Sequence, residues 1–332
     1  MKRVLTVTFA AALAAVLCAL TTARLPHGTT RAQSEQGQRH QHFEPGEPDV
    51  IEHRGNPHRQ GTGFLTAGGT GSLSPISYHN GQLIQTPTAY VIWYGNWNRG
   101  NGTDTPAGQQ IVRDFLSSVG GSNYYKVNTT YSAGGYNISG NVTRGTQEAS
   151  PGYSYGTRLT DANIQSIVKD AIASGALPAD SNGVYFVLTS SDVNERSGFC
   201  TRYCGWHTST SYTQTSNGRL RYSFVGNAAR CITSCAAQSV GPNGNAGVDG
   251  MISVVAHELE ETNTDPDPSS GWVDSSGAEN ADKCAWTFGS QQHTASNGAV
   301  YNMTLGARNY LIQRNLSATD NKCYIDWVNR IQ

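Results

Sequence analysis

One short stretch gathers side chains that can bind a metal and move a proton. The segment VVAHELEETNTDP, residues 254–266, places Glu258 directly after His257 and Glu261 four residues after that histidine. In a helix, residues four apart project from the same side, so His257 and Glu261 would reach one point together. An imidazole and a carboxylate one turn apart can both bind a divalent cation at about 2.0–2.2 Å. The spacing therefore predicts a metal-binding helix.

The remaining residues of this helix predict which side is buried. Helical spacing places Ser253 and Glu260 toward solvent. Glu258 falls between His257 and the apolar face, where an unpaired carboxylate is costly to bury. A glutamate beside a bound metal can accept a proton from water, so Glu258 is the predicted catalytic base. The apolar face comprises Ile252, Val255 and Leu259.

The motif differs by one residue from the zinc-peptidase helix H-E-x-x-H, because Glu261 stands where the second histidine would be. Imidazole and carboxylate suit zinc, which is the first choice of cofactor. The extra carboxylate provides a further oxygen ligand, which hard cations prefer, so calcium or manganese are alternatives.

A third protein ligand must come from elsewhere, and the next segment is acidic. We prefer Glu279, with Asp282 three residues later, because GAENAD can form a short helix that presents one carboxylate to the metal and the other to the His257 imidazole. Asp265 is the second choice, since it precedes Pro266 and must leave the helix. The alternative is that these acids cap helices and that His257 is a hydrogen-bonded core histidine. The acidic candidates are Asp265, Asp267, Asp274, Glu279 and Asp282.

The elements that would position these residues follow from periodicity and capping. An aromatic and β-branched run at 88–96 predicts a core strand, and 182–193 predicts a second, interior strand. Residues 219–228 alternate more and indicate an edge strand. Helices are predicted at 107–119 and from Thr160 or Asp161 to Gly175, and Asp249 can cap the metal-binding helix. Helices and strands mix without a strict βαβ rhythm, so the predicted class is α+β: a mixed sheet with packed helices, one of them zincin-like.

Six cysteines remain after Cys18 in the N-terminal segment is set aside. An even number in an exported chain favours three disulfides, and we expect Cys284 to pair with Cys323. Two C-x3-C pairs also fit a structural zinc site. The four cysteines left unassigned are Cys200, Cys204, Cys231 and Cys235.

The N-terminal part has the composition of an exported chain. Residues 1–23 combine a basic start, an apolar run and small residues, which is typical of a cleaved signal peptide. Residues 24–75 are polar and are predicted to be a disordered leader before a domain at 76–332. The net charge of -1 argues against nucleic acid, and no later segment could span a membrane once the signal is removed. The expected localisation is secreted, extracellular or in a cell wall.

Five stretches follow one another along the chain: YVIWYGNW, GVYFVLTSSDV, FCTRYCGWHT, YSFVGNAARC and GPNGNAGVDGM. Together they resemble the EXORDIUM-like, or phosphate-induced protein, family. The resemblance implies export, a link in plants to growth and to carbon or hormone responses, and no established reaction. Plant members lack the H-E-x-x-E helix after GVDGM, whereas microbial members look like this chain. The helix and GAENAD also resemble gluzincin peptidases, which implies His257, Glu261 and Glu279 as ligands, Glu258 as base and Asp282 as their support.

Two functional hypotheses follow. The first is a secreted metal-dependent hydrolase acting on peptides or on a cell-wall substrate. The second is a non-catalytic extracellular protein with a structural metal. His207, in CGWHT, is a candidate auxiliary residue that could stabilise an oxyanion, or else a loop histidine fixed by a disulfide.

Overall fold

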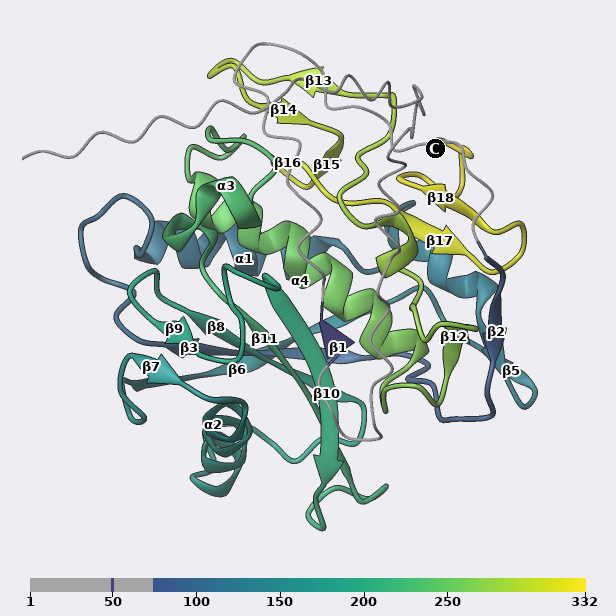
Figure 1. Ribbon diagram of the computed structural model, residues 1–332, viewed down its shortest axis with the longest axis horizontal. Helices are drawn as coiled ribbons and strands as arrows, with labels where there is room; N and C mark the ends of the chain where they lie inside the picture. The colour runs from purple at the N-terminus through teal and green to yellow at the C-terminus, as the bar shows by residue number, and fades with distance from the viewer. Residues whose placement is uncertain (1–48, 51–73) are drawn as a thin grey trace, which may run out of the picture. The chain divides into compact units, whose positions relative to one another are not determined.

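The structure is a computed structural model and describes residues 49–50 and 74–332 (Figure 1). The predicted signal peptide and almost all of the predicted leader lie outside the described residues. Six strands form a mixed sheet in the order β1-β10-β11-β8-β3-β6, which confirms the predicted α+β class. These strands are β1 (Asp49–Val50), β3 (Thr88–Tyr94), β6 (Thr143–Gly152), β8 (Gly183–Thr189), β10 (Gly205–Ser211) and β11 (Arg219–Val225).

The middle of the sheet is parallel and the β1 side is antiparallel. β3 pairs in parallel with both β6 and β8, and β8 pairs in parallel with β11. All seven residues of β8 are buried, as expected for a parallel strand covered on both faces. β10 pairs antiparallel with β11 and, on its other side, with the two residues of β1.

The prediction that residues 219–228 form an edge strand was wrong. β11 lies between β10 and β8, and Arg221 within it is buried. The Arg221 guanidinium forms an ion pair with Asp267 at 3.0 Å and donates to Gln82. A buried, paired arginine produces the same alternation of polar and apolar residues as an exposed edge.

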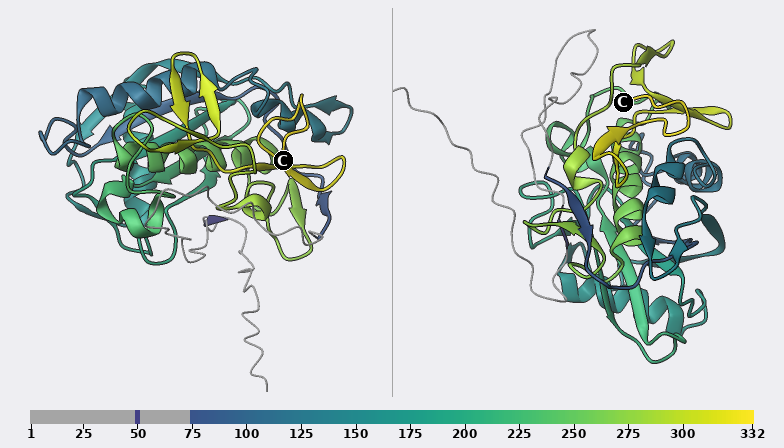
Figure 2. Two further views of the ribbon diagram at one scale, coloured as in Figure 1. Left: turned by 90° about the horizontal axis from the view of Figure 1, so that it is seen from above. Right: turned by 90° about the vertical axis from the view of Figure 1, so that its right-hand side faces the viewer.

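Helices cover both faces of this sheet. Figure 1 shows α2 (Asp161–Ala173) on one face and α4 (Ala246–Thr264) on the other, with α1 (Pro106–Ser118) running beside α4. Thr160 caps α2 with its hydroxyl, and Thr105 caps α1, so both predicted helices are confirmed. The C-terminal part of the chain packs against the side of α4 away from the sheet (Figure 2).

Helix α4 is buried along almost its whole length, which corrects the prediction that Ser253 and Glu260 face solvent. Both are buried: Gln313 from the C-terminal part of the chain covers Ser253, and Tyr124 lies against the Glu260 carboxyl. The Ser253 hydroxyl accepts a hydrogen bond from Gln313 N at 3.2 Å. Gly250 permits close contact with a further segment, since a Cβ there would lie 2.8 Å from the Ala236 Cβ. The helix begins earlier than predicted, with Asn245 rather than Asp249 as its cap.

The chain after α4 consists of short strands, turns and one short helix rather than a further layer. The prediction of a short helix over GAENAD was wrong, because the Asp274 carboxylate accepts from Ser276 N at 2.8 Å and from Ala278 N at 3.1 Å and so fixes a turn. The smaller strands are β2 (Ile76–Tyr78), β4 (Ser132–Ala133), β5 (Tyr136–Asn137), β7 (Arg158–Leu159), β9 (Asn194–Glu195), β12 (Trp272–Asp274), β13 (His293–Thr294), β14 (Val300–Tyr301), β15 (Met303–Leu305), β16 (Arg308–Tyr310), β17 (Asn315–Ser317) and β18 (Lys322–Tyr324). The short helices are η1 (Tyr125–Thr130), η2 (Ala228–Arg230), α3 (Ile232–Cys235) and η3 (Asp282–Cys284).

Three disulfides connect these elements. The predicted Cys284–Cys323 bond is confirmed and joins η3 to β18. The four cysteines left unassigned pair as Cys200–Cys231 and Cys204–Cys235. These two bonds join the chain just before β10 to the segment just before α4, so they connect the two elements that carry the candidate site.

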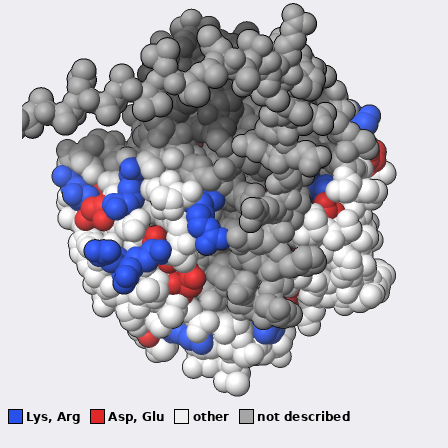
Figure 3. All heavy atoms as spheres, viewed as in Figure 1, with Lys and Arg blue, Asp and Glu red and all other residues white. Residues whose placement is uncertain are grey.

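No helix among the described residues is long and apolar enough to cross a membrane. On the described part of the face in Figure 3, basic and acidic side chains are interspersed among uncharged ones. This mixture fits the net charge of -1 and offers no single-sign surface there for a nucleic acid.

Candidate metal centre

Three separate parts of the chain bring six ligand-type side chains to one place. Strand β10 provides His207, and α4 provides three residues from consecutive turns. The turn that enters η3 provides Glu279 and Asp282. The side chains of all except Asp282, which is 20% exposed, are no more than 2% exposed. The His–carboxylate cluster comprises His207, His257, Glu258, Glu261, Glu279 and Asp282.

The first group within this cluster contains His257, Glu261 and Asp282, whose ligand atoms all lie within 4.8 Å of one another. His257 Nε2 lies 2.8 Å from Glu261 Oε1 and 3.6 Å from Asp282 Oδ1. The Asp282 backbone N–H also donates to Glu261 Oε1 at 2.9 Å. The predicted closeness of Asp282 to the His257 imidazole is present, and Asp282 is in addition close enough to share a cation with it.

The second group contains His207, Glu258 and Glu261, again with ligand atoms within 4.8 Å of one another. His207 Nδ1 lies 3.4 Å from Glu258 Oε2 and 3.7 Å from Glu261 Oε2. Helix α4 packs against β10, and this contact places the buried strand histidine opposite the two glutamates. Glu261 is therefore common to both groups.

The two imidazoles have opposite electrostatic surroundings. Burial lowers the pKa of His207 to about 4, against the opposing effect of the Asp265 carbonyl. Burial also acts to lower the pKa of His257, but the neighbouring Glu261 and Asp282 carboxylates outweigh it and hold that pKa well above its usual range. Without a metal, His257 therefore pairs with Glu261 as an imidazolium, while His207 is neutral.

Glu279 and Asp265 lie on the far side of His207. His207 Nε2 is 3.2 Å from the Asp265 carbonyl oxygen and 3.6 Å from Glu279 Oε2. The Asp265 carboxylate accepts from the backbone N–H groups of Ser269 and Gly271, both at 2.6 Å, so it supports the turn after α4. The structure thus places Glu279, the predicted third ligand, behind the His207 ring rather than beside His257.

Glu260 lies on another side of α4, away from these imidazoles. It is fully buried, and its carboxyl is next to the Tyr124 phenol. Burial holds the pKa of Glu260 well above its usual range, although the Tyr124 hydroxyl opposes this. Sequence reasoning missed this buried acid, and the close glycine spacing at Gly247 and Gly250 is the signal that could have shown a helix enclosed on all sides.

Sequence reasoning also gave His207 only an auxiliary role. The residue follows two cysteines in FCTRYCGWHT, and that spacing alone could not show that β10 packs against α4. The structure brings His257, Glu258, Glu261 and Asp282 together as the sequence suggested. Their roles as ligands or base stay predictions.

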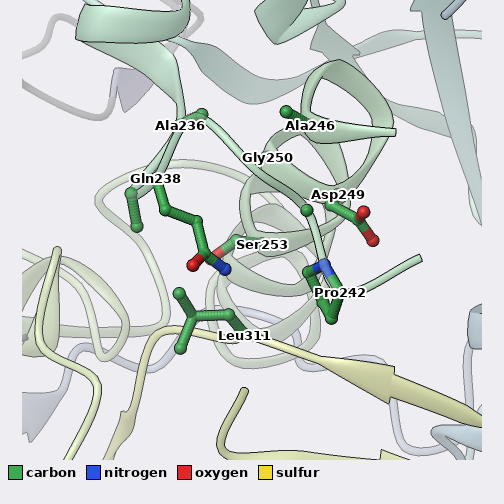
Figure 4. Close-up of a pocket in the computed structure, with 10 residues that line it drawn as sticks. Ala236, Gln238, Pro242, Ala246, Asp249, Gly250, Ser253 and Leu311 are labelled. Carbon is green, nitrogen blue, oxygen red and sulfur yellow. The ribbon is translucent and has the colours of Figure 1, made fainter. Parts of the chain in front are cut away.

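Two cavities formed by described residues lie elsewhere. The one in Figure 4 lies beside the first half of α4, where Gln238, Ser253 and Leu311 point inward. Its volume of about 10 Å³ is the space of one water molecule, so it is too small for an organic ligand. The other, of about 340 Å³, lies near Tyr124, His293 and Asp326.

Comparison with known proteins identifies the family. Residues 76–325 match the family model described as the phosphate-induced protein 1 conserved region. The chain is 32% identical to Protein EXORDIUM-like 3 of Arabidopsis thaliana, over 74% of this chain and 81% of that protein. It is 30% identical to Protein EXORDIUM-like 5 of the same plant, over 74% of this chain and 76% of that protein. It is 28% identical to Protein PHOSPHATE-INDUCED 1 of Nicotiana tabacum, over 58% of this chain and 66% of that protein. No solved structure matches the chain. This chain therefore belongs to the phosphate-induced protein 1, or EXORDIUM-like, family.

Proposed function

We propose that this chain is an exported protein that binds a divalent metal in the His–carboxylate cluster and uses it for hydrolysis, with peptides as the first substrate class. One observation carries the proposal: imidazoles and carboxylates from β10, α4 and the start of η3 converge in groups whose ligand atoms lie within 4.8 Å. Burying several carboxylates together is costly, and a divalent cation that binds them offsets that cost. Zinc is the first choice, because both ligand types suit it, and manganese or calcium are the alternatives.

The number of ligands supports a hydrolytic role. Each group supplies three protein ligands, whereas a structural zinc site is closed by four. A bound metal with a free coordination position would raise the acidity of water there and polarise a substrate carbonyl. In a site with one ion, held by His257, Glu261 and Asp282, the adjacent Glu258 would accept the proton of the attacking water. Helix α4 would then work as a gluzincin-like helix of a microbial member of the family, with Glu261 in place of the second histidine.

The second candidate is a non-catalytic protein of the extracellular space or cell wall, with a structural metal. The burial of the cluster favours it, because His257 and Glu258 are each only 1% exposed and a substrate must reach the metal. Asp282 is the most exposed of the six side chains and marks the side from which access would come.

Metal content tests the proposal. The full chain, expressed under oxidising conditions so that its disulfides form, is dialysed and measured by elemental analysis. We expect stoichiometric divalent metal that is reduced by His257→Ala. No bound metal in the wild-type chain, or content unchanged by this variant, would contradict the proposal.

Hydrolysis separates the two candidates. Wild type and Glu258→Gln are compared on a proteome-derived peptide library, with metal content measured in parallel. Cleavage by the wild type that the variant lacks supports the hydrolase. If the wild type contains metal but is as inactive as the variant, the hydrolase is rejected and the non-catalytic protein with a structural metal is supported.

Export is tested separately. The intact gene is expressed with its N-terminal segment in a secretion-competent host, and protein from the medium is sequenced from its N-terminus. A start near residue 24 agrees with cleavage of the predicted signal peptide, and retention of Met1 inside the cells would contradict export.

A further inference from the structure

Glu261 faces both imidazoles at once, with one oxygen toward each. Its Oε1 lies 2.8 Å from His257 Nε2, and its Oε2 lies 3.7 Å from His207 Nδ1. Each imidazole has a further carboxylate of its own: Asp282 beside His257 and Glu258 beside His207. A carboxylate between two metal ions in a two-metal site has this arrangement, with one oxygen on each ion.

We infer that the cluster binds two divalent cations bridged by the Glu261 carboxylate, the first held by His257 and Asp282 and the second by His207 and Glu258. This inference rests on the proposed function, because both require metal binding, and it specifies the number of ions and the ligands of each.

The distances fit two neighbouring ions. Two ligand atoms that each lie about 2.1 Å from one ion are separated by roughly 3.4 Å in a tetrahedral site. The separations of 3.4 and 3.7 Å around His207, and of 3.6 Å from His257 to Asp282, are near this value. Only the 2.8 Å contact between His257 and Glu261 is a direct hydrogen-bond distance, and it would lengthen by about 0.6 Å on binding a metal.

The orientation of His207 is the strongest reason for the second ion. A carbonyl oxygen can only accept a hydrogen bond, so the contact from His207 Nε2 to the Asp265 carbonyl places a proton on Nε2. Nδ1 is therefore the ring nitrogen that a cation can bind in place of a proton. It is fully buried and makes no hydrogen bond within the described part of the chain. Nδ1 faces oxygens of Glu258 and Glu261, so three atoms that commonly bind metals converge on one point. A backbone carbonyl behind the ring is also the usual support of a metal-binding histidine.

The charges agree with two ions. The cluster contains four carboxylates, from Glu258, Glu261, Glu279 and Asp282, and two imidazoles. When all four are ionised, their charge equals that of two divalent cations. Glu258 then binds the second cation instead of serving as the base.

Counting bound ions tests the inference. The full chain is stripped with a chelator, loaded with Zn²⁺, desalted and measured by elemental analysis. We expect two ions per wild-type chain, one for His207→Ala, one for His257→Ala and at most one for Glu261→Gln. His293→Ala, at an exposed position in β13, is the matched control and should retain two. Glu258→Gln separates the two roles of that residue. If Glu258 is a ligand, the variant should lose one ion, and if it is the base, the variant should retain both.

A second measurement reads the pair of ions directly in the wild-type chain. In the Mn²⁺-loaded wild-type chain, two ions on one carboxylate give the electron paramagnetic resonance spectrum of a coupled pair, which should become that of isolated Mn²⁺ in either histidine variant. One ion per wild-type chain with an uncoupled spectrum would overturn the second ion and leave the proposed function in place. No ion in the wild-type chain would overturn both.

Discussion

At the scale of single residues, the adjacent acids Glu260 and Glu261 have different surroundings, because α4 is enclosed on all sides. Glu261 lies between the two imidazoles, whereas Glu260 is buried next to Tyr124. In a helix, successive side chains are about 100° apart, so adjacent acids enter different surroundings. The local pattern predicted the direction of each side chain, but it could not show that Tyr124 covers Glu260 on the side where solvent was expected.

This difference gives a prediction for two adjacent substitutions. We expect Glu261→Gln to weaken divalent-metal binding by about 100-fold or more, because it removes a charged ligand atom, whereas supporting residues typically cost 10–100-fold. Glu260→Gln should change the affinity by less than about threefold. Isothermal titration with Zn²⁺ measures both variants, and equal losses would contradict the placement of Glu260 outside the site.

Asp249 gives a prediction for pH dependence at a position away from the cluster. Burial raises the pKa of its carboxyl from 3.8 to about 6, although hydrogen bonds from Asn243 oppose this. The folded chain therefore binds this proton more tightly than the unfolded chain. The associated stability is fully present below about pH 3.8 and is lost as the pH rises through about 6.

The measurement compares wild type with Asp249→Asn in urea unfolding between about pH 4 and pH 7. Two pKa units correspond to about 3 kcal/mol, so the wild type should lose up to about that free energy of unfolding relative to the variant over this range. Other titrating groups are shared and cancel in the comparison. Parallel pH profiles would show that the Asp249 carboxyl is not perturbed.

At the scale of elements, the turn between β12 and η3 carries Glu279 and leads into Asp282, the first residue of η3. Asp274 organises it by accepting hydrogen bonds from Ser276 and Ala278, and its carboxylate also pairs with Lys283. These contacts fix the turn that leads to the cluster.

We therefore expect Asp274→Ala to weaken metal binding by roughly tenfold without removing a ligand, because the turn that leads into Asp282 loses its support. Ser276→Ala is the control, since it removes only one hydroxyl from the same turn and should cost less than about threefold. Both are measured by competition with a chromophoric chelator. A normal affinity for Asp274→Ala would show that η3 and its disulfide alone hold Asp282.

The elements differ in how far the sequence predicts them. Helix α1 was predicted from apolar periodicity, α2 from periodicity and a cap at Thr160 or Asp161, and β3 and β8 from continuous apolar runs. The position of β11 was not, because Arg221 looks exposed in the sequence and is in fact buried against Asp267. A local pattern of polar and apolar residues predicts which side chains are buried. It fails for Arg221, because a charged residue that is buried in an ion pair has the same place in the pattern as an exposed one.

At the scale of the whole molecule, the site depends on which distant segments meet. The sequence predicted that His257, Glu258 and Glu261 lie together, because they lie within about one turn of a helix. The His207 part of the cluster needs β10 beside α4, and residues 207 and 258 are 51 positions apart, so no local pattern records their contact. The disulfides Cys200–Cys231 and Cys204–Cys235 join these segments, yet four cysteines allow three pairings, so the sequence left this connection open.

A metal in the cluster would connect β10, α4 and the turn before η3, so it should stabilise the folded chain as a unit. A ligand that binds only the folded state at 100 times its dissociation constant adds about 2.7 kcal/mol. For a domain of this size, 1 kcal/mol shifts the melting temperature by roughly 2–4 °C. We therefore expect Zn²⁺ to raise the melting temperature of the chelator-treated wild-type chain by roughly 5–10 °C, measured by calorimetry with the disulfides intact. The double variant His207→Ala/His257→Ala is the control, and its melting temperature should not respond to Zn²⁺. An equal rise in both proteins would place the bound zinc elsewhere on the chain, because removing both imidazoles takes one ligand from each group.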